Sequence, residues 1–148
     1  MERRVVITGM GAVTPLGNDV KTYWQGLKES RCGIAPLTAF DTAHHAAKLA
    51  AEVHIDVNTY IPAAESRKMD RFTQLAVIAA AEALANSGLT EQNCDFDRCC
   101  VLIGSGIGGL STITREHKRG MERGFDRVSP LFIPMSIANM AAGQVAIL

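Results

Sequence analysis

The sequence predicts a layered α/β fold, and three features carry this prediction. Two short apolar runs, Arg4–Thr8 and Arg98–Ile103, are each followed by glycine, as expected of strands buried on both faces of a parallel sheet. Between them, Arg71–Ser87 has the length and apolar character of a long buried helix. Alanine is abundant and aromatic residues make up only 5% of the chain, so helices can pack closely against a sheet. The 148 residues suffice for one domain with a hydrophobic core, and we treat residues 1–148 as that domain.

The first helix is predicted after the strand at Arg4–Thr8 and a glycine-rich loop. Asn18 or Asp19 can accept hydrogen bonds from the free amides of its first turn. Its apolar stripe consists of Val20, Trp24 and Leu27. Lys48–Val53 is predicted as a further strand, and Tyr60–Ser66 as irregular chain.

The clearest helix signal covers Arg71–Ser87. Asp70 can cap its first turn, and Gly88 stands where a left-handed C-terminal residue is expected. Because apolar side chains cover most of the helix circumference, we expect this helix inside a larger body.

The last part of the chain alternates between helix and extended backbone. Ser111–Glu122 is predicted as a short polar helix, and Ser129–Pro134 as an extended segment punctuated by proline. Ser136 is expected to cap a final helix that runs to Leu148. Since no cap, glycine or charge closes that helix, we expect the sequence to stop inside an element.

Composition excludes several classes of function. Fifteen basic side chains balance fifteen acidic ones, so nucleic acid is not an expected partner. No apolar run has the length of a signal peptide or a membrane span, which favours a cytoplasmic protein without membrane contact. The cysteines match no zinc-binding pattern, and we expect free thiols in a reducing compartment and no bound metal. They are Cys32, Cys94, Cys99 and Cys100.

A glycine-rich motif follows the predicted strand at Arg98–Ile103. Gly104, Gly106 and Gly109 have the spacing of a dinucleotide-binding loop, in which glycines let the backbone approach a pyrophosphate. Asp126 could be the acidic residue that such sites carry about twenty residues further on, but no second strand clearly carries it. The alternative is a tight turn between strand and helix where two backbones lie close together.

Cysteine and histidine could also form a catalytic pair, because such residues meet in space rather than in sequence. Cys99 and Cys100 lie in the predicted buried strand, however, and a thiol in apolar surroundings is unreactive. We therefore do not expect a catalytic pair from these cysteines and the histidines. The histidines are His44, His45, His54 and His117.

Two further segments have both a structural and a functional interpretation. Arg67, Lys68 and Arg71 cluster at the start of the long helix, where basic residues oppose the helix dipole. They are either a solvated surface or a site for an anionic partner. The apolar stretch Leu131–Met135 is either hydrophobic core or one wall of an acyl pocket or subunit interface.

Five segments, in order, resemble the condensing-enzyme (thiolase-like) family, and most closely its 3-oxoacyl-(acyl-carrier-protein) synthase II branch. The resemblance covers essentially the whole chain. The matching segments are Arg3–Gly17, Arg67–Phe72, Ile103–Gly109, Ser129–Pro134 and Asn139–Gly143.

The resemblance implies a layered α/β/α/β/α sandwich of two similar halves, of which this chain is most of the first. It also implies decarboxylative condensation of an acyl thioester with malonyl-acyl carrier protein, with acyl carrier protein as partner, a homodimer and no cofactor. The family's catalytic cysteine and two histidines match no position here, so the resemblance implies that this chain alone is inactive. Nucleotide binding, or a non-catalytic partner of a complete synthase, are the alternatives.

Supporting residues carry over by position. Ile107 resembles the residue that lines the acyl pocket beside the nucleophile, and Phe132 and Ile133 resemble pocket residues near the dimer interface. Arg67, Lys68 and Arg127 resemble the basic patch that docks acyl carrier protein. A local basic patch of this kind can steer an acidic partner even on a neutral protein.

Overall fold

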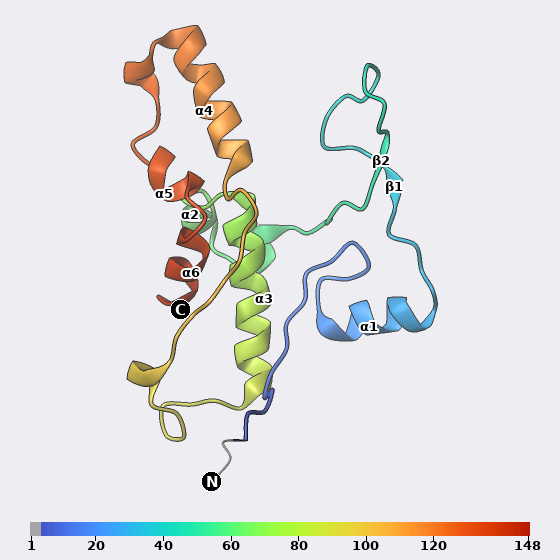
Figure 1. The fold of residues 1–148 in the computed structure, drawn as a ribbon, viewed down its shortest axis with the longest axis vertical. Coiled ribbons are helices and arrows are strands. Elements are labelled where there is room, and N and C mark those ends of the chain that lie inside the picture. The colour runs from blue at the N-terminus through green and yellow to red at the C-terminus, as the bar shows by residue number, and fades with distance from the viewer. Residues whose placement is uncertain (1–3) are drawn as a thin grey trace.

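A computed structural model describes residues 4–148, and helices dominate it (Figure 1). In chain order its elements are α1 (Val20–Lys28), β1 (Ala35–Pro36), β2 (Leu49–Ala50), η1 (Val57–Thr59), α2 (Ala63–Ser66), α3 (Arg71–Ser87), η2 (Phe96–Arg98), α4 (Leu110–Arg123), η3 (Phe125–Arg127), α5 (Phe132–Ser136) and α6 (Met140–Val145). Helix α3 stands at the centre. In Figure 1, α1 and the β1–β2 hairpin lie on one side of it, and α4, α5 and α6 lie on the other.

The hydrophobic core lies along one stripe of α3. Val77 and Ile78 of α3 pack against Val57 and Ile61, and α6 runs beside α3 with Val145 against this cluster. Other parts of α3 are exposed, and they include Leu84. The expectation that α3 lies inside a larger body is therefore met only in part by residues 4–148, which leave one side of the helix exposed.

The three predicted amphipathic or capped helices are confirmed. α3 has the predicted bounds, and Gly88 ends it in the left-handed region with a φ of 71°. α1 begins after Asp19, whose carboxylate accepts a 2.7 Å hydrogen bond from the Thr22 amide. That bond is the main reason why the pKa of Asp19 is lowered. α4 extends the predicted helix by one residue at each end.

The predicted strands are largely wrong for the described residues. Arg4–Thr8 forms no strand, and neither does Arg98–Ile103, which follows the short helical turn η2. Both segments expose apolar side chains: Val5 is 92% exposed and Leu102 is 93% exposed. A β-strand forms only where its backbone makes hydrogen bonds with a neighbouring strand, and neither segment has a neighbouring strand among residues 4–148. Of Lys48–Val53, only Leu49–Ala50 pairs, antiparallel to Ala35–Pro36.

Three local predictions need correction. Tyr60–Ser66 is not wholly irregular, since α2 begins directly after Pro62. Ser129–Pro134 is not extended, because α5 begins at Phe132 and Pro134 lies in its first turn, where the missing amide costs no hydrogen bond. Ser136 ends α5 rather than capping the last helix, and α6 ends at Val145.

A carboxylate of α3 holds the N-terminal part of the chain against this helix. Glu82 accepts hydrogen bonds from the amides of Ala12 at 2.8 Å and of Val20 at 2.9 Å. The Val20 amide belongs to the first turn of α1, where no partner exists within the helix. Glu82 therefore positions both the glycine-rich loop before α1 and the start of α1.

Candidate functional site

The glycine-rich segment before α4 lies directly on the end of α5. The Gly109 amide donates a 2.9 Å hydrogen bond to the Ser136 carbonyl oxygen. A Cβ on Gly109 would lie 2.2 Å from the Met135 carbonyl oxygen, and one on Gly108 would lie 2.5 Å from that of Ser136. Gly108 also has a φ of 82°, which favours glycine. These two glycines thus allow a close approach of two backbones, whereas Gly104 faces open space.

The first turn of α4 is capped by a residue from another helix. The buried carboxylate of Asp70 accepts hydrogen bonds from the Thr112 amide at 2.8 Å and from the Thr112 hydroxyl at 2.6 Å. Asp70 makes no side-chain bond to α3, the helix whose cap it was predicted to be. A carboxylate at a helix N-terminus is stabilised by the free amides and the helix dipole. Asp70 therefore ties α4 to α3.

The same carboxylate argues against a nucleotide at this loop. A dinucleotide-binding loop places a pyrophosphate on the free amides of the helix that follows it. Here the Thr112 amide already donates its hydrogen bond to the Asp70 carboxylate. The glycine-rich segment is thus better explained as a packing turn.

The residues that resemble acyl-pocket positions lie in one region. Ile107 is 63% exposed and immediately precedes the glycines that contact Ser136 at the end of α5. Phe132 and Ile133 form the first turn of the same short helix, about 6 Å along its axis from Ser136. Phe132 is half-buried and Ile133 is exposed. The close approach of loop and helix thus brings together the two segments that carry these three side chains.

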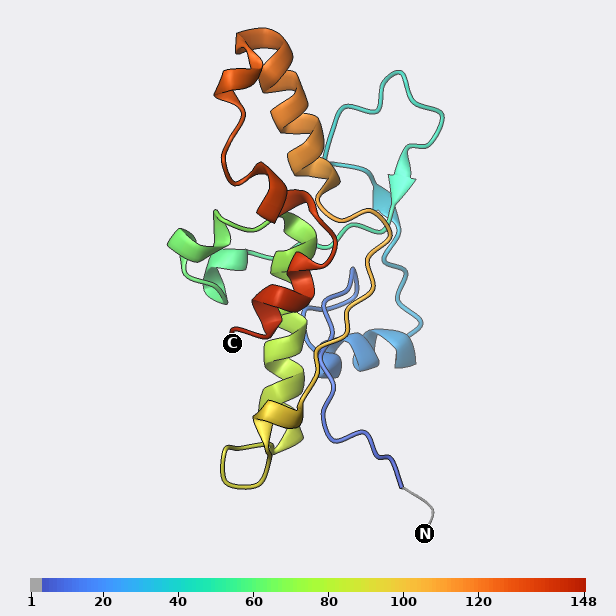
Figure 2. The ribbon, with the colours of Figure 1, turned by 60° about the vertical axis from the view of Figure 1, so that its left-hand side comes forward.

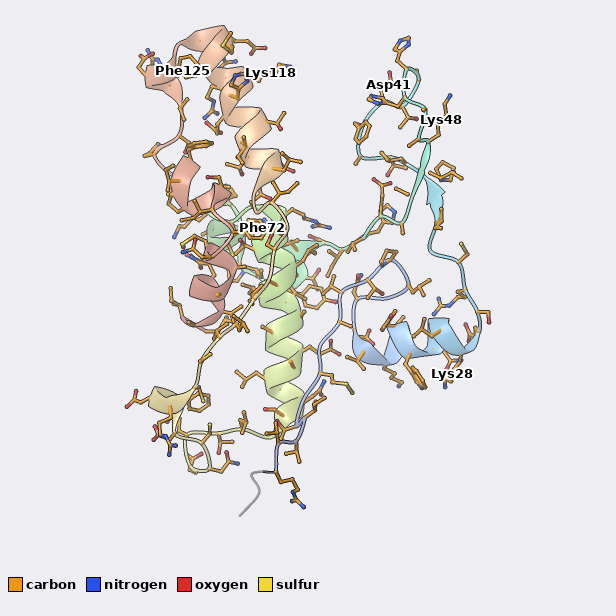
Figure 3. The ribbon with its side chains drawn as sticks, viewed as in Figure 1. Lys28, Asp41, Lys48, Phe72, Lys118 and Phe125 are labelled. Atoms are coloured by element: carbon orange, nitrogen blue, oxygen red, sulfur yellow. The ribbon has the colours of Figure 1, made fainter. Side chains whose placement is uncertain are left out.

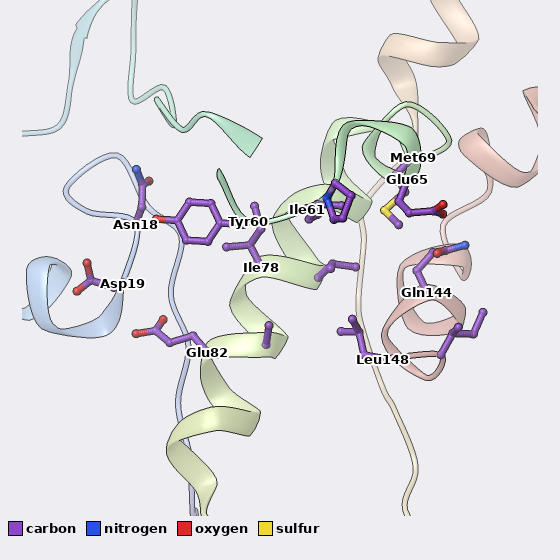
Figure 4. A pocket seen from close by; sticks show the side chains of 14 residues that line it. Asn18, Asp19, Tyr60, Ile61, Glu65, Met69, Ile78, Glu82, Gln144 and Leu148 are labelled. Atoms are coloured by element: carbon purple, nitrogen blue, oxygen red, sulfur yellow. The ribbon is translucent and has the colours of Figure 1, made fainter. Parts of the chain in front are cut away.

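A separate apolar cavity of about 450 Å³ lies between α3, α6, the η1–α2 segment and the loop before α1 (Figure 4). Ile61, Met69 and Ile78 form part of its apolar wall, while Glu65 and Glu82 contribute carboxylates at its edge. The sequence did not predict this cavity, because its walls come from segments far apart in the chain. Carboxylates at the edge make it unsuited to an anionic group.

Basic side chains gather on the α4–η3 arm, which projects away from α3 (Figures 1 and 3). Four arginines recur at every fourth residue and form what we call the arginine row: Arg115, Arg119, Arg123 and Arg127. The last three line one hollow. Only Arg127 was predicted as a site residue, although the four-residue spacing is the helical signal that could have revealed the rest.

The buried carboxylate of Glu116 holds two side chains of the arginine row in place. The Glu116 side chain is 3% exposed and forms ion pairs with Arg115 at 3.2 Å and with Arg119 at 3.1 Å. It also accepts a 3.0 Å hydrogen bond from the Ser129 amide. That bond, followed by the two arginines, holds the pKa of Glu116 below its usual value. Between residues 115 and 127, five basic side chains accompany three acidic ones, so the arm is positive on a neutral chain.

Arg67 and Lys68 lie apart from Arg127. Both are exposed at the end of α2, where the Arg67 side chain donates to the Ala63 carbonyl oxygen and Lys68 pairs with Glu65 at 3.0 Å. α4 begins beside Asp70 and has 14 residues, so its far end is about 21 Å from that point. The basic residues thus form two groups at opposite ends of α4. Arg71, the third member of the sequence cluster, instead donates to the Val53 carbonyl oxygen at 3.1 Å.

The cysteines do not have the burial that the predicted strand required. Cys99 and Cys100 are both exposed, since the segment that carries them has no sheet partner. Cys94 and Cys99 lie together, with their sulfur atoms 3.5 Å apart. Within residues 4–148, no hydrogen bond joins a cysteine to a histidine, and His45 instead packs its ring edge-on against Phe40. Across this same range, no helix combines the length and apolar character needed to cross a membrane.

This chain is similar in sequence to known proteins over nearly its whole length. The family described as "Beta-ketoacyl synthase, N-terminal domain" matches residues 2–148. The chain is 47% identical over 146 residues to the "3-oxoacyl-[acyl-carrier-protein] synthase 2" of Staphylococcus aureus strain N315, covering 98% of this chain and 35% of that protein. It thus spans about a third of the length of the curated relatives that it matches.

Solved structures extend the similarity to the fold. "The ishigamide ketosynthase/chain length factor" superposes with a TM-score of 0.86 at 28% identity, covering 99% of this chain and 37% of the other. The type II polyketide ketosynthase AntDE, solved in complex with its acyl-carrier protein AntF, superposes with a TM-score of 0.74 at 26% identity, covering 99% of this chain and 38% of the other. The backbone described above therefore follows that of ketosynthases, including the long segments that form no strand here.

Proposed function

Because the chain belongs to the beta-ketoacyl synthase family, we propose that it is the front part of a 3-oxoacyl-(acyl-carrier-protein) synthase II that elongates acyl chains in fatty-acid biosynthesis. The observation that carries this proposal is the 47% identity to a synthase 2 over 98% of the chain. The reaction joins an enzyme-bound acyl group to malonyl-acyl carrier protein with loss of carbon dioxide. The acyl transfer needs a cysteine thiolate, and two histidines stabilise the enolate that forms.

The site residues of this chain bind the substrate and take no part in forming the new carbon–carbon bond. Ile107, Phe132 and Ile133 line the apolar channel for the acyl chain, which suits their grouping at the contact between the glycine-rich loop and α5. The catalytic cysteine and histidines belong to the part of the relatives that this chain does not cover, so the chain alone is inactive. No metal or cofactor takes part in the proposed reaction.

Acyl carrier protein is the proposed partner of the basic residues. Arg67 and Lys68 form one contact area, and Arg127, with Arg119 and Arg123, forms a second on the outer part of the α4–η3 arm. An acidic carrier can meet both areas in succession or span them, and positive charge accelerates its approach. The polyketide ketosynthase solved with its carrier supports this assignment.

The complete fold follows from the same proposal. Arg4–Thr8 and Arg98–Ile103 become strands of the layered α/β/α/β/α sandwich once neighbouring strands pair with them. Their exposed apolar side chains, Val5 and Leu102 among them, support this. The whole protein is then a cytoplasmic homodimer.

The activity is tested on two samples: the natural protein that contains this chain, and residues 1–148 alone. Each is given an acyl-acyl carrier protein and carboxyl-labelled malonyl-acyl carrier protein. We expect the natural protein to release labelled carbon dioxide and form a 3-oxoacyl product, and the chain alone to do neither. If the natural protein forms no product, the synthase assignment is contradicted. The remaining alternative is then a non-catalytic partner of a complete synthase. Product from the chain alone contradicts its proposed inactivity.

The carrier site is tested by charge reversal in the natural protein. Arg123→Glu combined with Arg127→Glu should weaken carrier binding and raise KM for the carrier substrate with kcat nearly unchanged, because uniform binding is lost. Lys21→Glu combined with Lys28→Glu is the charge-matched control, because both lysines are exposed on α1, on the opposite side of α3 (Figure 3). Equal effects of both changes contradict a specific contact at the arm.

A further inference from the structure

A pair of thiols lies where the chain leaves α3 and turns toward the glycine-rich loop. The Sγ atoms of Cys94 and Cys99 are 3.5 Å apart, which is van der Waals contact. Cys94 is half-buried in the turn that precedes Arg98–Ile103, so a small reagent can reach its sulfur, and Cys99 needs only its contact with Cys94 to react. Neither residue has a part in the proposed reaction.

Local hydrogen bonds hold both cysteines in place. The Cys94 amide donates to the Thr90 carbonyl oxygen at 2.9 Å, and the Cys99 amide donates to that of Phe96 at 3.0 Å. The turn between them is capped by Asp95, whose carboxylate accepts from the Asp97 amide at 3.2 Å. The sulfur contact is thus built into a hydrogen-bonded turn rather than made by two free ends.

We propose that Cys94 and Cys99 form an intramolecular disulfide under thiol oxidation, which makes the connection between α3 and the glycine-rich loop a redox-sensitive modification site. A disulfide has an S–S distance of about 2.05 Å, so the sulfur atoms must approach by about 1.5 Å. Cys99 is extended (φ −85°, ψ 149°), and successive side chains of extended backbone point to opposite sides. Cys100 therefore points away from Cys94.

The oxidant is a small-molecule disulfide such as oxidised glutathione. The Cys94 thiolate attacks one glutathione sulfur, forms a mixed disulfide and releases one glutathione thiolate. The Cys99 thiolate then attacks the Cys94 sulfur, forms the Cys94–Cys99 bond and releases the second. The two protein thiols lose two electrons to the reagent and two protons to solvent. The pKa of Cys99 is raised by its hydrogen bond with the Cys94 thiol, then by desolvation, which supports Cys99 as the second thiol to react.

Tryptic mapping without reduction tests the proposal, because trypsin cleaves after Arg98, between the two cysteines. The complete protein is incubated with oxidised glutathione, and free thiols are then blocked by alkylation. We expect a linked species of peptides 72–98 and 99–115 that separates on reduction. It should persist in Cys100→Ser and Cys32→Ser and be lost in Cys94→Ser and Cys99→Ser.

Three results overturn the proposal. A linked species that persists in Cys99→Ser assigns the bond to Cys100. Glutathione adducts without any linked species show that the pair does not close. A bond confined to peptide 99–115 shows that Cys99 joins Cys100 instead. The wild-type protein alone already distinguishes a bond to Cys94 from an open pair and from a Cys99–Cys100 bond. Fragmentation of the linked wild-type peptides between Cys99 and Cys100 then identifies the cysteine joined to Cys94, so a serine variant that fails to fold does not remove the test.

Discussion

Asp70→Asn should loosen the attachment of α4 to α3. The Asp70 carboxylate accepts two hydrogen bonds from Thr112, at 2.8 and 2.6 Å, in a site where Thr112 is completely buried. Both bonds go to one carboxylate oxygen, Oδ2, so asparagine keeps the size and an acceptor oxygen but removes the negative charge from both bonds. Hydrogen bonds to a charged group contribute about 1.5–3 kcal/mol net. We therefore expect the local free energy of opening at Thr112 to fall by about that amount.

Amide hydrogen exchange at Thr112 measures this change directly. Since about 1.4 kcal/mol corresponds to a factor of ten, exchange should become about 10- to 150-fold faster. Asp41→Asn is the matched control, because Asp41 accepts a backbone hydrogen bond at 2.9 Å in an exposed loop far from α4 (Figure 3). An acceleration below about twofold in Asp70→Asn, or an equal one in Asp41→Asn, would refute the capping role.

Three further changes probe the packing, the charge and the exposed apolar segments. Gly109→Ala should destabilise the protein by about 1–3 kcal/mol in urea unfolding, because its Cβ would lie 2.2 Å from a carbonyl oxygen, whereas Gly104→Ala, in open space, should not; equal effects would contradict the packing explanation. The pKa of Glu116 is lowered in the folded protein, so its contribution to stability is complete above the unfolded value near 4.5 and is lost as the pH falls through the folded pKa. Glu116→Gln should therefore flatten the fall in the urea midpoint between pH 6 and pH 3. An unchanged pH profile would contradict this. Leu102→Lys should reduce light scattering by the isolated 148-residue chain, because it removes a 93% exposed apolar side chain, and unchanged scattering would show that this segment does not drive association.

The helices could be predicted because their signals are local. Asp19 and Gly88 mark the ends of α1 and α3 through the conformations that they themselves adopt. The hydrogen bonds of a helix join residues four apart, so a window of sequence contains all the partners. α5 could not be predicted in this way, because proline is typical of extended chain as well as of the first turn of a helix, where Pro134 lies.

The strands could not be verified in the same way. Arg98–Ile103 has the composition of a buried strand, but its hydrogen bonds depend on neighbours that residues 4–148 do not supply. The exposure of Cys99 and Leu102 follows from that absence. Composition thus identified segments able to form strands without determining whether they pair.

The sequence by itself determined the family, three of the helices and the residues that resemble pocket and docking positions. The tertiary structure alone decided where those residues meet. It assigned the Asp70 carboxylate to α4 instead of α3, placed Arg127 in the turn after α4 and Arg67 just before α3, and brought Cys94 within 3.5 Å of Cys99. The physical reason is the range of the interactions: helix propensity and capping act within one turn of the chain, whereas a buried carboxylate bonds whichever donors the packing of distant segments brings to it.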